Sequence, residues 1–142
     1  MSQIITIADA VVASLNEASF NPEFTAQRLY QPIFELSDMQ TLHVSVVPRS
    51  ETISGASRSE EYFDHAIDIG VQKKLDTTGL DEIDALMDLV EQIVDHLRHR
   101  RLAEEPTATW MSIKRDPVFV VEHLDQLRQF TGVLTVTYRM RR

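Results

Sequence analysis

The sequence contains no cysteine. This absence excludes disulfide bonds, thiolate zinc sites and cysteine nucleophiles, so any chemistry would rest on carboxylates, hydroxyls or the five histidines. Long hydrophobic runs are also missing, because the longest uninterrupted apolar stretches, 10–13 and 118–121, have only four residues each. About 20 such residues are needed to cross a bilayer, so we expect no transmembrane helix and no membrane partner.

The sequence also lacks the marks of secretion and of common enzyme motifs. No Lys or Arg precedes Arg28, and Asp9 interrupts the first apolar stretch, so the basic region of a secretory signal is missing and we expect a cytoplasmic chain. The four glycines never fall into a phosphate-binding spacing, and no Gly-x-Ser-x-Gly turn is present. We therefore expect no enzymatic activity and no bound cofactor.

Positive charge is scarce and unevenly placed. The chain has 14 Lys and Arg against 22 Asp and Glu, a net charge of −8, which disfavours non-specific binding to nucleic acid. Residues 51–95 hold twelve acidic and three basic side chains, whereas 111–142 hold three acidic and six basic ones. The surface is expected to have an acidic and a basic part.

The hydrophobic periodicity predicts one domain over 1–142 with an α+β fold. Apolar residues recur at helical spacing over 6–17 and again over 81–101. Period-two alternation marks a short strand that ends at Pro48 and longer strands over 63–71 and 134–140, with weaker strands over 24–30 and 108–113. We expect a mostly antiparallel sheet, with an N-terminal helix and one long central helix that crosses the sheet from end to end on one face.

A serine-rich segment, Arg49 to Glu61, lies between two of these strands. It has a single bulky aliphatic residue, Ile53, and too little apolar surface to offset an ordering cost of about 1–2 kcal/mol per residue. The sequence predicts a mobile loop over 49–61. Loops of this length are commonly functional, so we interpret it as a docking arm with Ile53 as its anchor and Arg58 and Glu60 setting its register.

Two groups of residues have a spacing found in metal sites. His96 and His99 lie three apart, but arginines surround them, and a basic helix C-terminus is the better interpretation. Asp64 and Asp68 share one strand face with Gln72 and Lys74, as in metal-dependent nucleases, where carboxylates hold the cation and a lysine assists the attacking water. A solvated strand face is the simpler interpretation, and we expect no metal site.

Five carboxylates form a stripe along the helix expected over 81–101. They recur at steps of three and four on the side opposite the apolar stripe, and no cation interrupts them: Asp81, Asp84, Asp88, Glu91 and Asp95. A solvated face explains such a stripe, and a partner surface or the wall of a channel is the functional alternative. A second charged set lies near the C-terminus: Arg128, Arg139, Arg141 and Arg142. We expect these arginines to pair with acidic side chains of a neighbouring subunit.

Several segments together resemble the tail terminator, or tail-completion and neck, proteins of long-tailed bacteriophages. They are 7–12 (Ile-Ala-Asp-Ala-Val-Val), 27–30 (Gln-Arg-Leu-Tyr), 43–48 (His-Val-Ser-Val-Val-Pro), 69–74 (Ile-Gly-Val-Gln-Lys-Lys) and 130–139 (Phe-Thr-Gly-Val-Leu-Thr-Val-Thr-Tyr-Arg). The resemblance covers most of the chain in element order. It implies a structural virion protein, typically a hexameric ring, that caps the tail tube protein, stops its polymerisation and meets the head connector while DNA passes through its centre.

Three other functions remain open at this point. One is a small metal-dependent nuclease that uses Asp64, Asp68 and Lys74, and another is a neighbouring neck component such as a head-closure protein. The third is an acidic binding module of the regulatory or antitoxin type.

Overall fold

The computed structural model describes residues 2–31, 41–76 and 78–142, which form three helices and one five-stranded mixed sheet. The helices are α1 (Gln3–Glu17), α2 (Asp81–Leu97) and α3 (Val121–Leu127), and the strands are β1 (Ala26–Arg28), β2 (His43–Gly55), β3 (Glu61–Lys74), β4 (Thr109–Lys114) and β5 (Gln129–Arg141). The predicted α+β class is confirmed. No helix among these residues is long and apolar enough to cross a bilayer.

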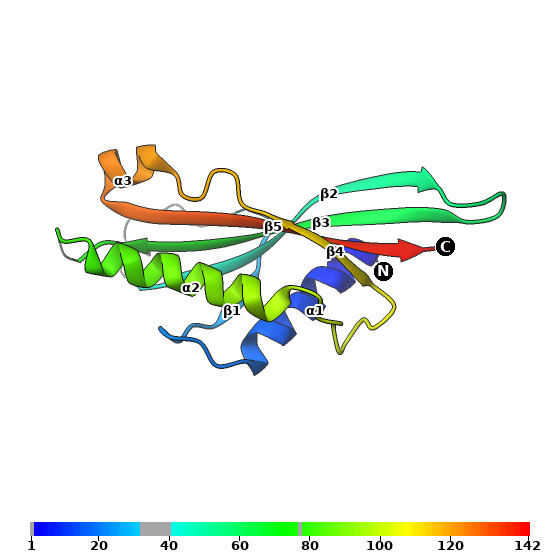
Figure 1. The fold of residues 1–142 in the computed structure, drawn as a ribbon, viewed down its shortest axis with the longest axis horizontal. Coiled ribbons are helices and arrows are strands. Elements are labelled where there is room, and N and C mark those ends of the chain that lie inside the picture. Colours follow the sequence, from blue (N-terminus) through cyan, green and yellow to red (C-terminus); the bar gives the residue numbers. More distant parts are fainter. Residues whose placement is uncertain (1, 32–40, 77) are drawn as a thin grey trace.

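The strands lie in the order β1-β2-β3-β5-β4 (Figure 1). The pairings β2–β3, β3–β5 and β4–β5 are antiparallel, and only the short β1 runs parallel to its neighbour β2. The expectation of a mostly antiparallel sheet is therefore confirmed. The three central strands, β2, β3 and β5, are long, and β3 pairs with its two neighbours along its full length. These three strands form the centre of the sheet.

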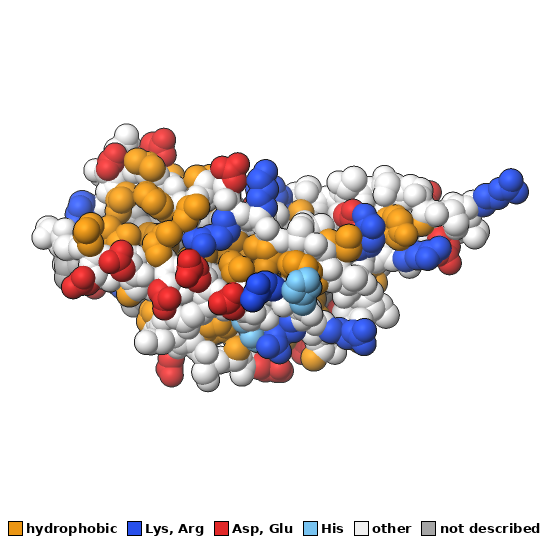
Figure 2. Space-filling view, viewed as in Figure 1, with side chains coloured by type: hydrophobic (Ala, Val, Ile, Leu, Met, Phe, Trp, Pro, Cys, Tyr) orange, Lys and Arg blue, Asp and Glu red, His pale blue; other side chains and the backbone are white. Residues whose placement is uncertain are grey.

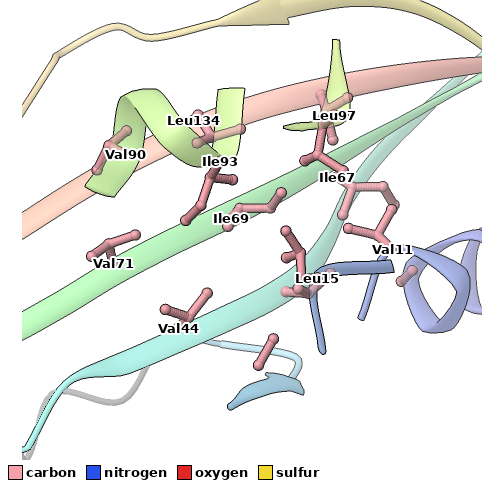
Figure 3. Packing of buried hydrophobic residues seen from close by; sticks show 14 of the residues in the cluster. Val11, Leu15, Val44, Ile67, Ile69, Val71, Val90, Ile93, Leu97 and Leu134 are labelled. Atoms are coloured by element: carbon pink, nitrogen blue, oxygen red, sulfur yellow. The ribbon is translucent and has the colours of Figure 1, made fainter. Parts of the chain in front are cut away.

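One face of the sheet carries the core, and α1 and α2 pack on it (Figure 3). Alternate residues of β3, including Ile67, Ile69 and Val71, are fully buried there, because successive strand side chains point to opposite faces. Every third or fourth residue of α2 meets them, with Val90 and Ile93 fully buried. The period-two pattern of β3 and the helical pattern of α2 thus mark the side chains that meet in one core.

The helix predicted over 81–101 ends earlier, at Leu97. Arg98 leaves the helix with extended backbone, and His99 has a left-handed φ of 59°. At 1.5 Å per residue the 17 residues of α2 span about 26 Å, whereas the 14 residues of β3 span about 46 Å. The expectation that this helix crosses the sheet from end to end is therefore wrong, and one end of the long strands extends beyond the helices.

The predicted loop over 49–61 is also wrong, because β2 continues through Pro48 to Gly55 and pairs with β3. A β-bulge between Pro48 and Ser50 shifts the register. Before the bulge, even-numbered residues of β2 such as Val46 face the core. After the bulge, the odd-numbered residues lie on that face, and Ile53 pairs with Phe63, whose side chain faces the core. Residues 49–55 are exposed on both faces, so they carry few apolar side chains and no alternating hydrophobic pattern that would mark a strand.

We call residues 49–64 and 139–142 together the arm. It consists of the β2–β3 hairpin, whose turn closes with hydrogen bonds from the backbone N–H of Ala56 and Ser57 to the carbonyl of Glu60, and the end of β5. The arm projects beyond the helices, and both faces of its β2 strand are exposed (Figure 1). Gln3 at the start of α1 bonds His65 at 2.9 Å, so helix cover ends where the arm begins.

Candidate assembly surfaces

The five carboxylates of the predicted stripe all lie on the solvent side of α2, where each is exposed. Gln92 donates a hydrogen bond to Asp88 at 3.0 Å, and Arg98 lies 3.8 Å from Asp95. Asp84 and Glu91 have no ion pair among the described residues. Like charges at these spacings repel one another by about 0.2–0.5 kcal/mol per pair, so α2 carries an uncompensated acidic face.

An apolar surface lies beside this acidic face, at the end of the molecule that holds the start of α2 and the short helix α3 (Figure 2). Half-buried residues from both elements pack against the core there, and two neighbouring leucines are exposed by 72% and 37%. We call this set the end patch: Ile83, Met87, Phe119, Leu124, Leu80 and Leu127. An exposed apolar patch with a polar rim is typical of a protein contact surface.

The sequence did not predict the end patch, because half of it comes from α3 and the segment before it. Helix α3 has only seven residues, none of them fully buried. It is held by the chain around it, since the backbone N–H of Val120 donates to the carbonyl of Thr131 and His123 bonds the Thr131 hydroxyl at 2.8 Å. Tertiary contacts, more than local propensity, position this helix.

The arm carries the predicted anchor. Ile53 is 54% exposed on the same face of the arm as Phe63, which is almost fully buried. The guanidinium of Arg142 lies 4.1 Å from the centre of the Phe63 ring and covers it. Ile53 has no such cover, so it is the outermost large hydrophobic side chain of the arm.

Two of the predicted inter-subunit arginines are already paired within the chain. Arg139 binds Asp64 through Nε at 2.8 Å and Nη2 at 3.0 Å, and Arg141 forms an ion pair with Glu60. The hydrogen bond from Arg139 holds the pKa of the Asp64 carboxyl below its usual range. Arg58, in the hairpin turn, is exposed and makes no ion pair with any described residue.

The four C-terminal arginines do not form one basic patch. Arg128 caps α3 with a left-handed φ of 53°, at the start of β5, whereas Arg139, Arg141 and Arg142 lie at the other end of that strand. The 13 residues of β5 separate the two ends by about 40 Å. Arg128 and the other three arginines therefore lie at opposite ends of the molecule, and Arg128 lies beside the end patch.

The nuclease residues are not arranged as a metal site. Asp68 accepts a hydrogen bond from Thr135 at 2.6 Å and pairs with Arg49, while Asp64 is held by Arg139. Four residues along an extended strand separate the two carboxylates by about 13 Å, and Lys74 lies about 20 Å beyond Asp68. Within the described residues there is no group of three His, Asp or Glu side chains placed to hold a metal ion.

The two helix histidines point to different surroundings. His96 bonds the Ser14 hydroxyl at 2.9 Å and meets the Phe20 ring edge-on, whereas His99 lies beyond the helix with its ring 4.4 Å from that of Trp110. Burial, followed by the nearby Arg100 cation, lowers the pKa of His96. His96 therefore joins α2 to α1, and the pair does not share a ligand.

An apolar hollow lies along α2, between its last turns and the edge strand β4. It encloses about 380 Å³ and is lined by Val94, Arg98, Trp110, Ile113 and Arg115. The Nε and Nη2 atoms of Arg115 and the Nε1 atom of Trp110 are buried without a hydrogen-bond partner among the described residues. Helix α2 leaves the inner face of β4 only partly covered.

No known family model matches this chain, and no curated protein matches it.

Proposed function

We propose that this chain is a tail terminator of a long-tailed bacteriophage, a structural virion protein that assembles into a ring. The ring caps the last layer of the tail tube, stops its polymerisation and joins the tube to the head connector. The sequence segments that resemble this family support the proposal, together with an α+β chain that has separate contact surfaces.

One observation carries the proposal. The end patch and the arm lie at opposite ends of the long axis of the molecule (Figures 1 and 2). Two different surfaces at opposite ends favour heterologous contacts, in which each copy binds the next in the same direction. Such contacts generate a ring when the rotation between copies closes, and the proposed ring is a hexamer.

The acidic face of α2 has a role in this ring as the wall of the central passage. Asp84, Asp88 and Glu91 repel phosphate groups, whereas cations there would form contacts that release counterions and hold the genome. DNA then moves through without specific binding, and the finished protein resides in the virion after assembly in the host cytoplasm.

Multi-angle light scattering and negative-stain electron microscopy of the purified protein test the ring, since the single chain has a mass of 16.3 kDa. We expect closed rings of about six copies. Adding the protein to polymerising tail tube protein of the same phage tests the cap, and we expect tubes to stop growing and to carry one ring at an end. Tubes that elongate unchanged would refute the terminator function, and binding to the connector alone would favour a head-closure protein.

A supercoiled plasmid incubated with the protein and Mg²⁺ or Mn²⁺ tests the nuclease. We expect no nicking by the wild-type chain. Nicking that is lost in Asp68→Asn would replace the structural proposal with the enzymatic one.

A further inference from the structure

We infer that the hollow between α2 and β4 binds an acidic, extended segment of another protein. The segment lies along β4, its carboxylate binds the guanidinium of Arg115, and an apolar side chain two residues away packs beside Ile113. This contact uses neither the arm nor the end patch, so it goes beyond the proposed function and does not depend on it.

The donors of Arg115 define the chemistry of the ligand. Its Nε and Nη2 atoms are buried without a hydrogen-bond partner among the described residues, and Arg115 forms no ion pair with any of them. These two atoms make up the edge of a guanidinium that binds a carboxylate side-on. Arg139 uses the same edge within this chain, since its Nε and Nη2 atoms bind the two carboxylate oxygens of Asp64 at 2.8 and 3.0 Å. Arg115 thus presents the same fork to a carboxylate from outside.

Another donor belongs to the same hollow. The indole Nε1–H of Trp110, which also lines the hollow, is buried without a hydrogen-bond partner among the described residues. A buried donor has lost its bond to water, so an acceptor supplied by a ligand is favourable there. The backbone carbonyl groups of an extended segment are acceptors of this kind.

The lining of the hollow combines apolar surface with positive charge (Figure 2). Its lining residues are Val94, Trp110 and Ile113 with two arginines, Arg98 and Arg115, and no acidic side chain is among them. Arg98 has one ion pair, 3.8 Å long, with the exposed Asp95, and a surface pair of this length contributes little. A carboxylate next to an apolar side chain therefore complements this surface, and the α2 carboxylates assigned to the passage wall take no part in it.

The edge of the sheet favours an extended segment. Strand β4 is last in the strand order, and among the described strands it pairs only with β5. Alternate residues of an edge strand direct their backbone N–H and C=O groups away from the sheet, where an added strand can bond them. The β-bulge of β4 lies between Trp110 and Ser112, before Ile113 and Arg115.

Ile113 and Arg115 set the spacing of the ligand. They are two residues apart and both line the hollow, so the residues opposite them in an added strand are also two apart. The segment should therefore carry an apolar and an acidic residue that are separated by one other residue. A strand that adds to a sheet edge in this way gains affinity from its main chain and specificity from alternate side chains.

Selection from a random-peptide display library on the full chain tests the inference. We expect the enriched sequences to contain Asp or Glu two residues from an aliphatic or aromatic residue. The best of them, made as a synthetic peptide, should bind about tenfold or more tightly than the same peptide with its acidic residue replaced by the corresponding amide.

Trp110 reports on the hollow directly, because it is the only tryptophan of the chain. Binding of the acidic peptide should shift its indole N–H resonance in a nitrogen–proton correlation spectrum. Amide hydrogen exchange over 109–114 should slow as the added strand covers the edge of β4. An indole resonance that stays in place while the peptide binds would move the site elsewhere and overturn the inference.

Two substitutions separate the fork from its charge. Arg115→Gln removes the cation, whereas Arg115→Lys keeps the charge but loses the two-pronged geometry, and each should weaken peptide binding by about tenfold or more. Arg58→Gln is the matched control, because it removes one exposed cation from the hairpin turn and should bind the peptide as the wild type does. Circular dichroism establishes that all three variants are folded. Unchanged binding to Arg115→Gln, enrichment of peptides without an acidic residue, or no enrichment would overturn the inference.

Other occupants give different results. Isocaproate that binds as tightly as the peptide would assign the hollow to a small organic acid, and a lower molecular mass of the assembly in Arg115→Gln would assign it to a second copy. Either result overturns the inference. Failure of the wild-type chain to cap tubes would refute the terminator function and leave the inference standing.

Discussion

The guanidinium of Arg139 on β5 donates two parallel hydrogen bonds, 2.8 and 3.0 Å long, to the carboxylate of Asp64 on β3, where the arm begins. The same guanidinium lies 4.2 Å from the centre of the Tyr62 ring. The fork-like geometry fixes both side chains, so β3 and β5 are held together where the helices no longer cover them. The arm is therefore a braced extension of the sheet.

The Arg139–Asp64 pair makes a pH-dependent contribution to stability. Because its pKa is depressed in the folded state, the Asp64 carboxyl stabilises the fold above its unfolded pKa near 3.8, and the contribution disappears as the pH falls through the folded value. We expect Asp64→Asn to lower the free energy of unfolding at pH 7 and to differ little from the wild type near pH 2. Urea unfolding at both pH values measures this.

Glu91→Gln is the control for that experiment, since Glu91 is exposed and lacks an ion pair within the described chain. Its unfolding free energy should not fall at pH 7. A deficit in Asp64→Asn that stays the same size at pH 2 would show that the carboxylate charge is not the cause.

His96 and His65 should make the fold less stable in mild acid. Burial lowers the pKa of both rings below the ordinary value near 6.5, so the unfolded chain takes up protons before the folded one does. Stability should fall as the pH drops from 7 to 5. His96→Gln should reduce this pH dependence, as measured by thermal unfolding monitored with circular dichroism.

The exposed His99 provides the comparison, and Asn tolerates its left-handed backbone. His99→Asn should keep the wild-type pH profile. An identical slope in wild type and His96→Gln would assign the acid sensitivity to other groups.

Two strand glycines should respond oppositely to alanine. A Cβ at Gly132 would lie 3.1 Å from Phe130 Cε1 and 3.3 Å from Val90 Cγ2, whereas a Cβ at Gly70 meets nothing within 4 Å. Gly132→Ala should cost about 1 kcal/mol or more through overpacking beneath α2. Gly70→Ala should raise the free energy of unfolding by about 0.4–1 kcal/mol, because alanine reduces the conformational entropy of the unfolded chain. Denaturant unfolding measures both variants. Equal effects in the two variants would contradict the close approach of α2 to β5.

Two isoleucines separate folding from assembly. Ile93 of α2 is fully buried, and Ile93→Ala should cost about 2–5 kcal/mol through the lost contacts and the cavity left behind. Ile53→Ala should change the free energy of unfolding by less than about 0.5 kcal/mol, because the side chain is exposed. Chemical unfolding below the assembly concentration measures both. A large folding loss in Ile53→Ala would mean that the arm is part of the core.

The sequence alone determined the α+β class and most of the elements. The apolar stripe of α2 and the alternating apolar residues of β3 are both set by burial in the core. Their spacing can be recognised in the local sequence, from residues such as Ile67, Ile69, Val90 and Ile93. The exposure of the carboxylates on α2 was predictable for the same reason, because they lie opposite the buried stripe.

Only the tertiary structure decided where the surfaces lie. The β-bulge at Arg49 changed which residues of β2 face the core. Helix α3 depends on tertiary hydrogen bonds such as that between His123 and Thr131. Arg128 and Arg139 belong to opposite ends because β5 is extended between them. Exposure of Ile53 follows from the length mismatch between a 17-residue helix and strands of 13 and 14 residues, which is a property of how elements pack and not of any single segment.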